Sequence, residues 1–198
     1  ELDAKYGRNP DLEKMPMHGV VFSFKDPFDT KDMRTTGGGD ARYDNDFPAR
    51  DHVLVEQLRS KGAIIFAKAV NTEYNGRAGD PGGRHTPAKV LPSVLWYQRS
   101  TWAGNPSNPY DTTRAASLGS SSGSGSSVSA NLVMASLGEE TRASTRGPAN
   151  HNAVALILPH KAMLGFDGGA IGADIYCDRS GILCRTIADC AKVLDALK

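Results

Sequence analysis

The sequence predicts an α/β fold, in which helices flank a β-sheet. Residues 20–24 form an apolar run of strand length. An amphipathic segment at residues 51–61 leads directly into a second apolar run at residues 63–67, and this alternation of helix and strand is typical of layered α/β domains. A third short apolar run occupies residues 154–158. Because 39% of the 198 residues are hydrophobic, the chain can bury one core, and we expect residues 1–198 to form a single domain.

The first predicted strand ends at a lysine. Within residues 18–29, HGVVFSFKDPFD, the apolar run stops at Lys25, Asp26 and Pro27. A lysine at the end of a strand is usually a surface residue whose charged end reaches water. The pattern alone therefore favours a structural role for Lys25.

The first predicted helix spans residues 51–61. Its apolar residues, Val53, Leu54, Val55 and Leu58, alternate with charged residues, and Gly62 follows as a stop signal. This places a helix next to the strand predicted at residues 63–67.

A long loop is predicted at residues 77–100, where glycine, proline and arginine dominate. Trp96 and Tyr97 lie near its end and Trp102 follows it. Long loops often shape substrate entry, which makes these aromatic residues candidates for a substrate pocket. The alternative is a surface excursion with a few aromatic anchors.

A serine-rich stretch lies in the middle of the chain. Residues 119–125 are all glycine or serine and favour a sharp turn. An apolar segment at residues 128–137 follows, which we expect to be one buried element, and then a polar turn that contains Ser144. A flexible linker and a phosphate-binding loop are the alternatives, although the lysine of G-x-x-x-x-G-K-[ST] is absent.

These segments resemble the signature of a known family, the amidase signature hydrolases. The family pattern reads approximately G-G-S-S-G-G-S-x-x-x-V-A-x-G, then a short apolar run, then G-T-D-T-G-G-S-I-R and P-A. Residues 119–124 are similar to its first part, residues 128–132 to its second and residues 138–149 to its third. The alignment needs no gap over the 24 residues from Ser120 to Ser144.

The resemblance extends over about residues 16–198 and implies the amidase signature fold, with a mixed, twisted sheet flanked by helices. Residues 178–186 are similar to the family's D-x-x-G-P-h-A-R-T, which predicts that Thr186 caps a final helix through Leu197. The chain begins without methionine and stops at Lys198, and the family's catalytic domains are longer. We therefore expect an internal piece of a larger protein.

The resemblance also implies a catalytic triad. Ser144 is expected to attack the substrate carbonyl, Ser120, on a cis peptide bond, to pass the proton, and Lys25 to act as base and then as acid. Residues 19–26 are similar to the family's G-h-P-h-x-h-K-D strand and lack only the proline. A lysine serves as a base only when burial or nearby charge lowers its pKa by several units from about 10.4.

The backbone N–H groups of Thr141, Arg142, Ala143 and Ser144 are implied as the oxyanion hole. Arg142 and Ala143 stand where the family has Gly-Gly, and a side chain there costs about 1 kcal/mol or more if the glycine has positive φ. Arg142 is therefore also a candidate pocket residue, with Trp96 and Trp102.

The function expected is hydrolysis of C–N bonds in small amides or carbamates through an acyl-enzyme, without a metal or another cofactor. One alternative is the catalytic subunit of a glutamine-dependent amidotransferase, and another is a catalytically silent relative that acts as a binding module. His151 and His160 would be the bases of a Ser-His-Asp enzyme, but no G-x-S-x-G motif occurs. A homo-oligomer stays open.

Composition argues against other classes. Lys and Arg number 23 against 22 Asp and Glu, which is not the basic excess typical of nucleic-acid binding. No apolar run approaches the roughly 18 residues needed to span a bilayer, and the N-terminus has no signal-peptide core. We expect neither nucleic acid nor membrane as a partner, and a cytoplasmic location.

Overall fold

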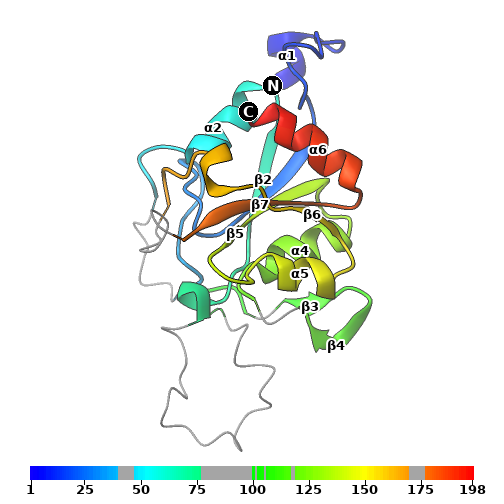
Figure 1. The fold of residues 1–198 in the computed structure, drawn as a ribbon. Helices are drawn as coiled ribbons and strands as arrows, with labels where there is room; N and C mark the ends of the chain where they lie inside the picture. Colours follow the sequence, from blue (N-terminus) through cyan, green and yellow to red (C-terminus); the bar gives the residue numbers. More distant parts are fainter. Residues whose placement is uncertain (40–46, 77–99, 101, 105, 117–118, 170–176) are drawn as a thin grey trace, which may run out of the picture.

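A five-stranded sheet forms the centre of the computed structural model, which describes residues 1–39, 47–76, 100, 102–104, 106–116, 119–169 and 177–198 (Figure 1). The strand order is β2-β1-β5-β7-β6. These strands are β1 (Val21–Lys25), β2 (Ile64–Ala69), β5 (Ala135–Glu140), β6 (Ala155–Ile157) and β7 (Arg179–Cys184). Strand β1 pairs in parallel with β2 and β5, whereas β7 pairs antiparallel with β5 and β6. The expected mixed sheet is confirmed.

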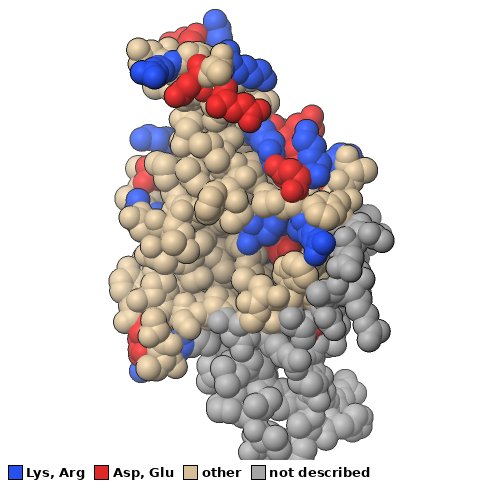
Figure 2. Space-filling view, turned by 180° about the vertical axis from the view of Figure 1, so that it is seen from behind, with Lys and Arg blue, Asp and Glu red and all other residues tan. Residues whose placement is uncertain are grey.

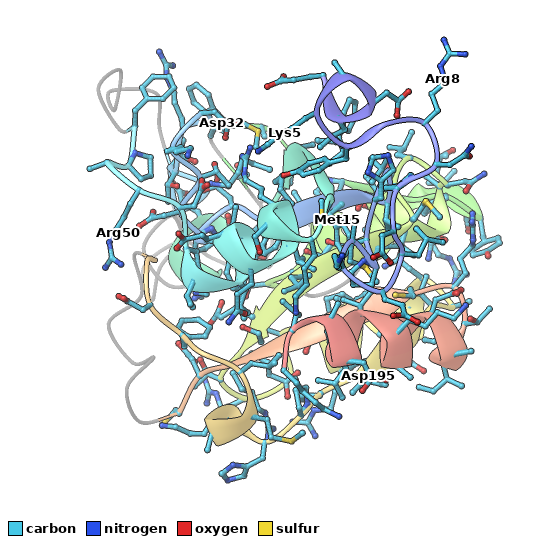
Figure 3. The ribbon with its side chains drawn as sticks, turned by 90° about the horizontal axis from the view of Figure 1, so that it is seen from above. Lys5, Arg8, Met15, Asp32, Arg50 and Asp195 are labelled. Carbon is cyan, nitrogen blue, oxygen red and sulfur yellow. The ribbon has the colours of Figure 1, made fainter. Side chains whose placement is uncertain are left out.

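Helices cover both faces of this sheet. Helices α2 (Val53–Ser60) and α6 (Ile187–Ala196) pack on one face, where Figure 3 shows them side by side. Helices α4 (Ser122–Ser129) and α5 (Arg146–His151) pack on the other. The remaining described elements are α1 (Leu2–Tyr6), η1 (Glu73–Gly76), η2 (Lys161–Met163) and a two-stranded sheet of β3 (Ser107–Asn108) and β4 (Asp111–Ala115).

The alternation of side chains along β1 decides where Lys25 points. Phe22 and Phe24 belong to the core beneath α2 and α6, and Val21 packs against the core beneath α4 and α5. Because successive residues of a strand face opposite sides of a sheet, Lys25 shares the face of Val21. This is the face on which the serine-rich helix α4 lies.

Several predicted elements are confirmed with small shifts at their ends. The helix predicted at residues 51–61 is α2, the strand predicted at 63–67 is β2, and the strand predicted at 154–158 is β6. Thr186 caps α6, since its hydroxyl oxygen accepts the N–H of Asp189 at 3.1 Å. Strand β7 was not predicted, although it lies between β5 and β6 in the sheet.

Two interpretations of the serine-rich stretch are wrong. The segment at residues 128–137 is not one buried element, because α4 ends at Ser129, β5 begins at Ala135, and Leu132 and Met134 between them are exposed. The stretch is also no flexible linker, because most of α4 is buried against the sheet. Its small residues permit this close packing.

Charges of both signs are mixed on the protein surface. Figure 2 shows Lys and Arg next to Asp and Glu rather than gathered into a patch of one sign. Within the described ranges, no helix is both long and apolar enough to cross a bilayer. The expected cytoplasmic location stays a prediction.

Gly123 is expected to tolerate no side chain. It is the second residue of α4, and a Cβ there would lie 2.4 Å from the backbone nitrogen of Val70 and 2.8 Å from its carbonyl oxygen. We expect Gly123→Ala to destabilise the protein by about 1–3 kcal/mol, the usual cost of overpacking. Thermal unfolding of the full-length protein measures this.

Gly147→Ala is the matched control, because Gly147 is the second residue of α5 and a Cβ there would lie 3.9 Å from the carbonyl oxygen of Gly119, an ordinary contact distance. Both substitutions raise helix propensity alike. Equal stability of the two variants would contradict the packing argument.

Candidate active site

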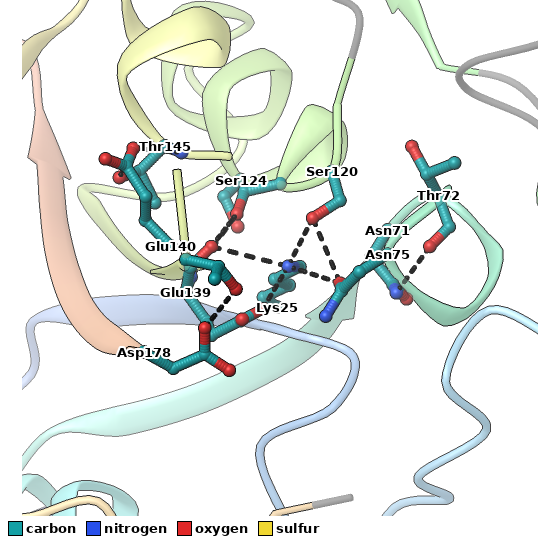
Figure 4. Close-up of polar contacts among 12 residues, drawn as sticks. Lys25, Asn71, Thr72, Asn75, Ser120, Ser124, Glu139, Glu140, Thr145 and Asp178 are labelled. Atoms are coloured by element: carbon teal, nitrogen blue, oxygen red, sulfur yellow. Dashed lines mark hydrogen bonds and ion pairs between the residues drawn. The ribbon is translucent and has the colours of Figure 1, made fainter. Parts of the chain in front are cut away.

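Lys25 forms the centre of a buried polar cluster (Figure 4). Its side chain is 0% exposed, and its Nζ donates to Ser120 Oγ at 2.6 Å and to Asn75 Oδ1 at 2.8 Å. Nζ also contacts the carboxylate of Glu139 and reaches the Glu139 carbonyl oxygen at 3.4 Å. The surface interpretation of Lys25 is therefore wrong, because β2 and β5 flank this strand and α4 covers its face.

Backbone contacts to the end of β2 hold Ser120 beside Lys25. The Ser120 carbonyl oxygen accepts the N–H of Thr72 at 3.0 Å, and the N–H of Gly123 donates to the Val70 carbonyl at 2.8 Å. The peptide bond between Gly119 and Ser120 is cis, as the resemblance implied. The Ser120 hydroxyl also donates to Asn75 Oδ1 at 3.0 Å, so Lys25 and Ser120 share this acceptor.

Ser144 lies in the turn between β5 and α5. Its carbonyl oxygen accepts the N–H of Ser121 at 3.0 Å, which ties this turn to the residue after Ser120. Its side chain is half-buried, and its hydroxyl makes no hydrogen bond within the described ranges. The structure thus brings the two serine turns together, while the direct side-chain contact it shows is between Lys25 and Ser120.

A buried carboxylate, Glu140, holds the turn that follows Ser144. One oxygen of Glu140 accepts the N–H groups of Thr145 and Arg146, each at 3.0 Å, and the other accepts Arg146 Nε at 2.7 Å. Burial works against ionisation of Glu140, but the hydrogen bonds from Arg146 and Thr145 outweigh it and lower its pKa. Glu140, which replaces the family's aspartate, thus stays charged and anchors the turn.

Backbone N–H groups are available beside Ser144. The N–H groups of Thr141, Arg142, Ala143 and Ser144 donate to no acceptor in the part of the chain that the structure describes. None of the non-glycine residues with positive φ lies in this turn. The side chains of Arg142 and Ala143 therefore cost no left-handed backbone strain here, and both are exposed.

Sequence reasoning missed two residues of the cluster. Glu139 is 1% exposed and contacts Lys25; it stands where the family pattern has threonine, and this departure was the signal that could have revealed it. Asn75, in η1, contacts both Lys25 and Ser120. No motif pointed to Asn75.

Opposing effects act on the protonation of Lys25. Burial lowers the pKa of Lys25 from its ordinary value, while the charge of Glu139 and the hydrogen bond to it act in the opposite direction. The net shift is downward. Asp178 stands nearby, and its Oδ1 accepts the Thr141 hydroxyl. Burial raises the pKa of Asp178 to about 6.

The candidate pocket residues are less closely tied to this cluster. Trp102 lies at a shallow hollow that Asp26 and Asn71 also line, and the guanidinium of Arg34 stands 5.5 Å from its ring centroid. The side chain of Arg142 is exposed and forms no ion pair within the described ranges. Trp96 and Tyr97 lie outside the described residues, as does the predicted loop at 77–100 apart from its last residue.

The two histidines lie away from the cluster. The carbonyl oxygen of His151 accepts from Asn108 at 2.7 Å, and the ring nitrogen Nδ1 of His160 accepts the N–H of Ala162 at 3.2 Å. Neither contacts Lys25, Ser120 or Ser144 where the chain is described. In the same residues, no three His, Cys, Asp or Glu side chains are grouped so that they could hold a metal ion.

Comparison with known proteins gives consistent relatives. A family model described as Amidase matches residues 1–198. A probable amidase of Arabidopsis thaliana is 36% identical over 194 residues, which covers 96% of this chain and 35% of that protein. One mitochondrial subunit of the glutamyl-tRNA(Gln) amidotransferase of Anopheles gambiae is 31% identical, with 98% and 36% covered.

A solved structure has the same arrangement. The native peptide amidase from Stenotrophomonas maltophilia superposes with a TM-score of 0.78 at 31% identity, over 98% of this chain and 36% of that one. The chain thus spans about a third of the length of these proteins.

Proposed function

This chain belongs to the amidase family, and from that premise we propose that the protein containing it hydrolyses C–N bonds of small amides through Ser144, Ser120 and Lys25. The observation that supports this most directly is the 2.6 Å contact between Lys25 Nζ and Ser120 Oγ in a fully buried site. A lysine in this position can exchange a proton with a serine hydroxyl. A serine hydroxyl needs such a base because it is a weak nucleophile at neutral pH.

The proposed reaction begins with Ser144. Its Oγ attacks the amide carbonyl, its proton moves to Ser120 Oγ, and the proton of Ser120 moves to neutral Lys25 Nζ. The backbone N–H groups of the Thr141–Ser144 turn donate to the oxyanion that forms. Contacts of this kind are often long in ligand-free sites and shorten when substrate binds, which is the change expected between Ser144 and Ser120.

The proton then returns along the same path. Lys25 gives it back through Ser120 to the nitrogen of the leaving amine, the C–N bond breaks, and an ester to Ser144 remains. Water attacks this ester with the same relay as base, which releases the acid and restores Ser144. No proton or electron is needed from elsewhere.

The amide is the substrate class proposed, with carbamates as the second class to assay. The exposed Arg142 side chain beside the Ser144 turn is placed to meet the part of the substrate that projects from the site. The aromatic residues near position 100 are a further expectation, of which Trp102 lies at the hollow that Asp26 lines.

A second candidate function is suggested by the relative that is part of a glutamyl-tRNA(Gln) amidotransferase. In that case glutamine would be the amide, and activity would require a partner protein. Hydrolysis of a simple aryl amide by the full-length protein alone favours the free amidase. Activity with glutamine only, and only with the partner, favours the amidotransferase, and binding without turnover favours a catalytically silent binding module.

A fluorophosphonate probe tests the proposal, because it reacts with activated serines. We expect the full-length protein to gain one adduct by intact mass, with peptide mapping to Ser144. The Lys25→Arg variant should be labelled far more slowly, because arginine stays charged and cannot act as the base. A well-folded wild-type protein that resists the probe, or an adduct on another serine, would contradict the proposal.

A further inference from the structure

Glu139 adds a charge to the site that the Ser-Ser-Lys relay does not require. It lies near the end of β5 as a fully buried carboxylate in contact with Lys25, whose side chain is equally buried. Removing two such charges from water is expensive, so the attraction between them has to offset the cost. A buried carboxylate in contact with the base must influence when that base holds a proton.

Asp178 is the nearest partner of Glu139 in this respect. Glu139 Oε1 and Asp178 Oδ2 are both buried without a hydrogen-bond partner among the described residues. A buried carboxylate oxygen without a donor is costly. One proton held between the two carboxyl groups gives both oxygens a partner, and the pKa of Asp178, which burial and the neighbouring Glu139 raise to about 6, fits a carboxyl group that retains such a proton.

We propose that Glu139 is the counter-charge that controls the protonation of Lys25, and that Asp178 shares a proton with it. Glu139 then acts through Lys25 and is a positioning residue. The inference rests on the proposed function in giving Lys25 the role of base. It adds a residue for which the triad has no role.

The other groups around Lys25 leave Glu139 as the dominant charge. Asp26 follows Lys25 in the chain, but its carboxylate already accepts two N–H groups and a hydroxyl from Thr36 and Gly38, each at 3.0 Å. Asn75 from η1 and Ser120 from the turn before α4 are uncharged. Of the carboxylates of Glu139, Asp178 and Asp26 that act on Lys25, Glu139 is the one in direct contact.

The hydrogen-bond pattern shows why this control matters. A charged Lys25 has three protons, and Nζ has three side-chain acceptors, in Ser120, Asn75 and Glu139. In that state Nζ has no lone pair for the proton of Ser120. The negative charge of Glu139 favours this charged state, so loss of the charge should let Lys25 become a base at lower pH.

The direct test is the titration of Lys25 itself. In full-length protein labelled with ¹³Cε-lysine, the Lys25 resonance is the one missing from Lys25→Arg. We expect Glu139→Gln to lower the Lys25 pKa by at least about one unit, a tenfold change in the ratio of neutral to charged amine at a given pH. The acid limb of kcat/KM should move to lower pH by the same amount. Asp167→Asn, which removes an exposed carboxylate paired with Arg50, should leave both unchanged.

The outcomes separate this inference from the proposed function. A Lys25 resonance that titrates alike in wild type and Glu139→Gln overturns the inference. A lowered Lys25 pKa in a protein whose Ser144 resists the probe supports the counter-charge and contradicts the hydrolase. Should Glu139→Gln fail to fold, Glu139→Thr provides the same test with a smaller neutral side chain.

The shared proton has its own signature. Carboxyl ¹³C resonances of the wild type should include one that titrates near pH 6, and Asp178→Asn should lack it, because the amide N–H replaces the proton. Retention of that titration in Asp178→Asn would show that the proton is held elsewhere.

Discussion

Replacement of Ser144 by alanine is expected to reduce amide hydrolysis by the full-length protein about 10⁴-fold or more, the scale on which serine hydrolases depend on their nucleophile. The substitution removes the attacking oxygen while it leaves the buried pair of Lys25 and Ser120 in place. Because the Ser144 hydroxyl makes no hydrogen bond within the described ranges, its loss should hardly change the melting temperature. Initial rates with an aryl amide, together with thermal unfolding, measure both effects.

Ser126→Ala is the matched control for Ser144→Ala. Ser126 lies on α4 in the serine-rich stretch, and its hydroxyl bonds only weakly, at 3.4 Å, to the Gly123 carbonyl. This variant should keep nearly full activity. If Ser144→Ala hydrolysed the amide as fast as Ser126→Ala, Ser144 could not be the nucleophile.

Replacement of Lys25 by methionine is expected to lower both activity and stability. Loss of a general base typically costs 10²–10⁴-fold in rate, and we expect about that here. Methionine also leaves Glu139 as a buried charge without its partner, and breaking a buried ion pair in this way costs about 3–5 kcal/mol. Rates and chemical denaturation of the full-length protein measure the two losses separately.

The double variant Lys25→Met/Glu139→Gln separates catalysis from folding. It removes both charges, so most of the lost stability should return, while activity should stay as low as in the single variant. A double variant as unstable as Lys25→Met would mean that Glu139 is not the partner whose isolation destabilises the protein. Recovery of activity would mean that Lys25 is not the base.

Local pattern was sufficient for much of the fold. The apolar runs that became β1, β2 and β6 and the amphipathic segment that became α2 could be recognised in short windows, because burial on one or two faces imposes a period on the sequence. The capping of α6 by Thr186 was equally local. Strand β7 was missed, because a strand between two neighbours need not alternate polar and apolar residues.

The candidate site was only partly predictable. Ser120, Ser144 and Lys25 followed from the spacing of a signature, and Glu139 could have been noticed as a departure from it. Asn75 could not, because it lies 50 residues from Lys25 in the chain and contacts its amine only through the packing of η1 against the site. The aromatic residues at 96 and 97 stay predictions.

The sequence by itself determined which elements form and which residues belong to the signature, since both depend on the order of residues along the chain. Only the tertiary structure decided that Lys25 is buried and that its amine meets Ser120 and Glu139. The reason is that burial, and with it the protonation of a lysine, depends on which strands and helices surround the residue. Those neighbours come from β5, η1 and the turn before α4, and the sheet order that assembles them is a property of the packed chain.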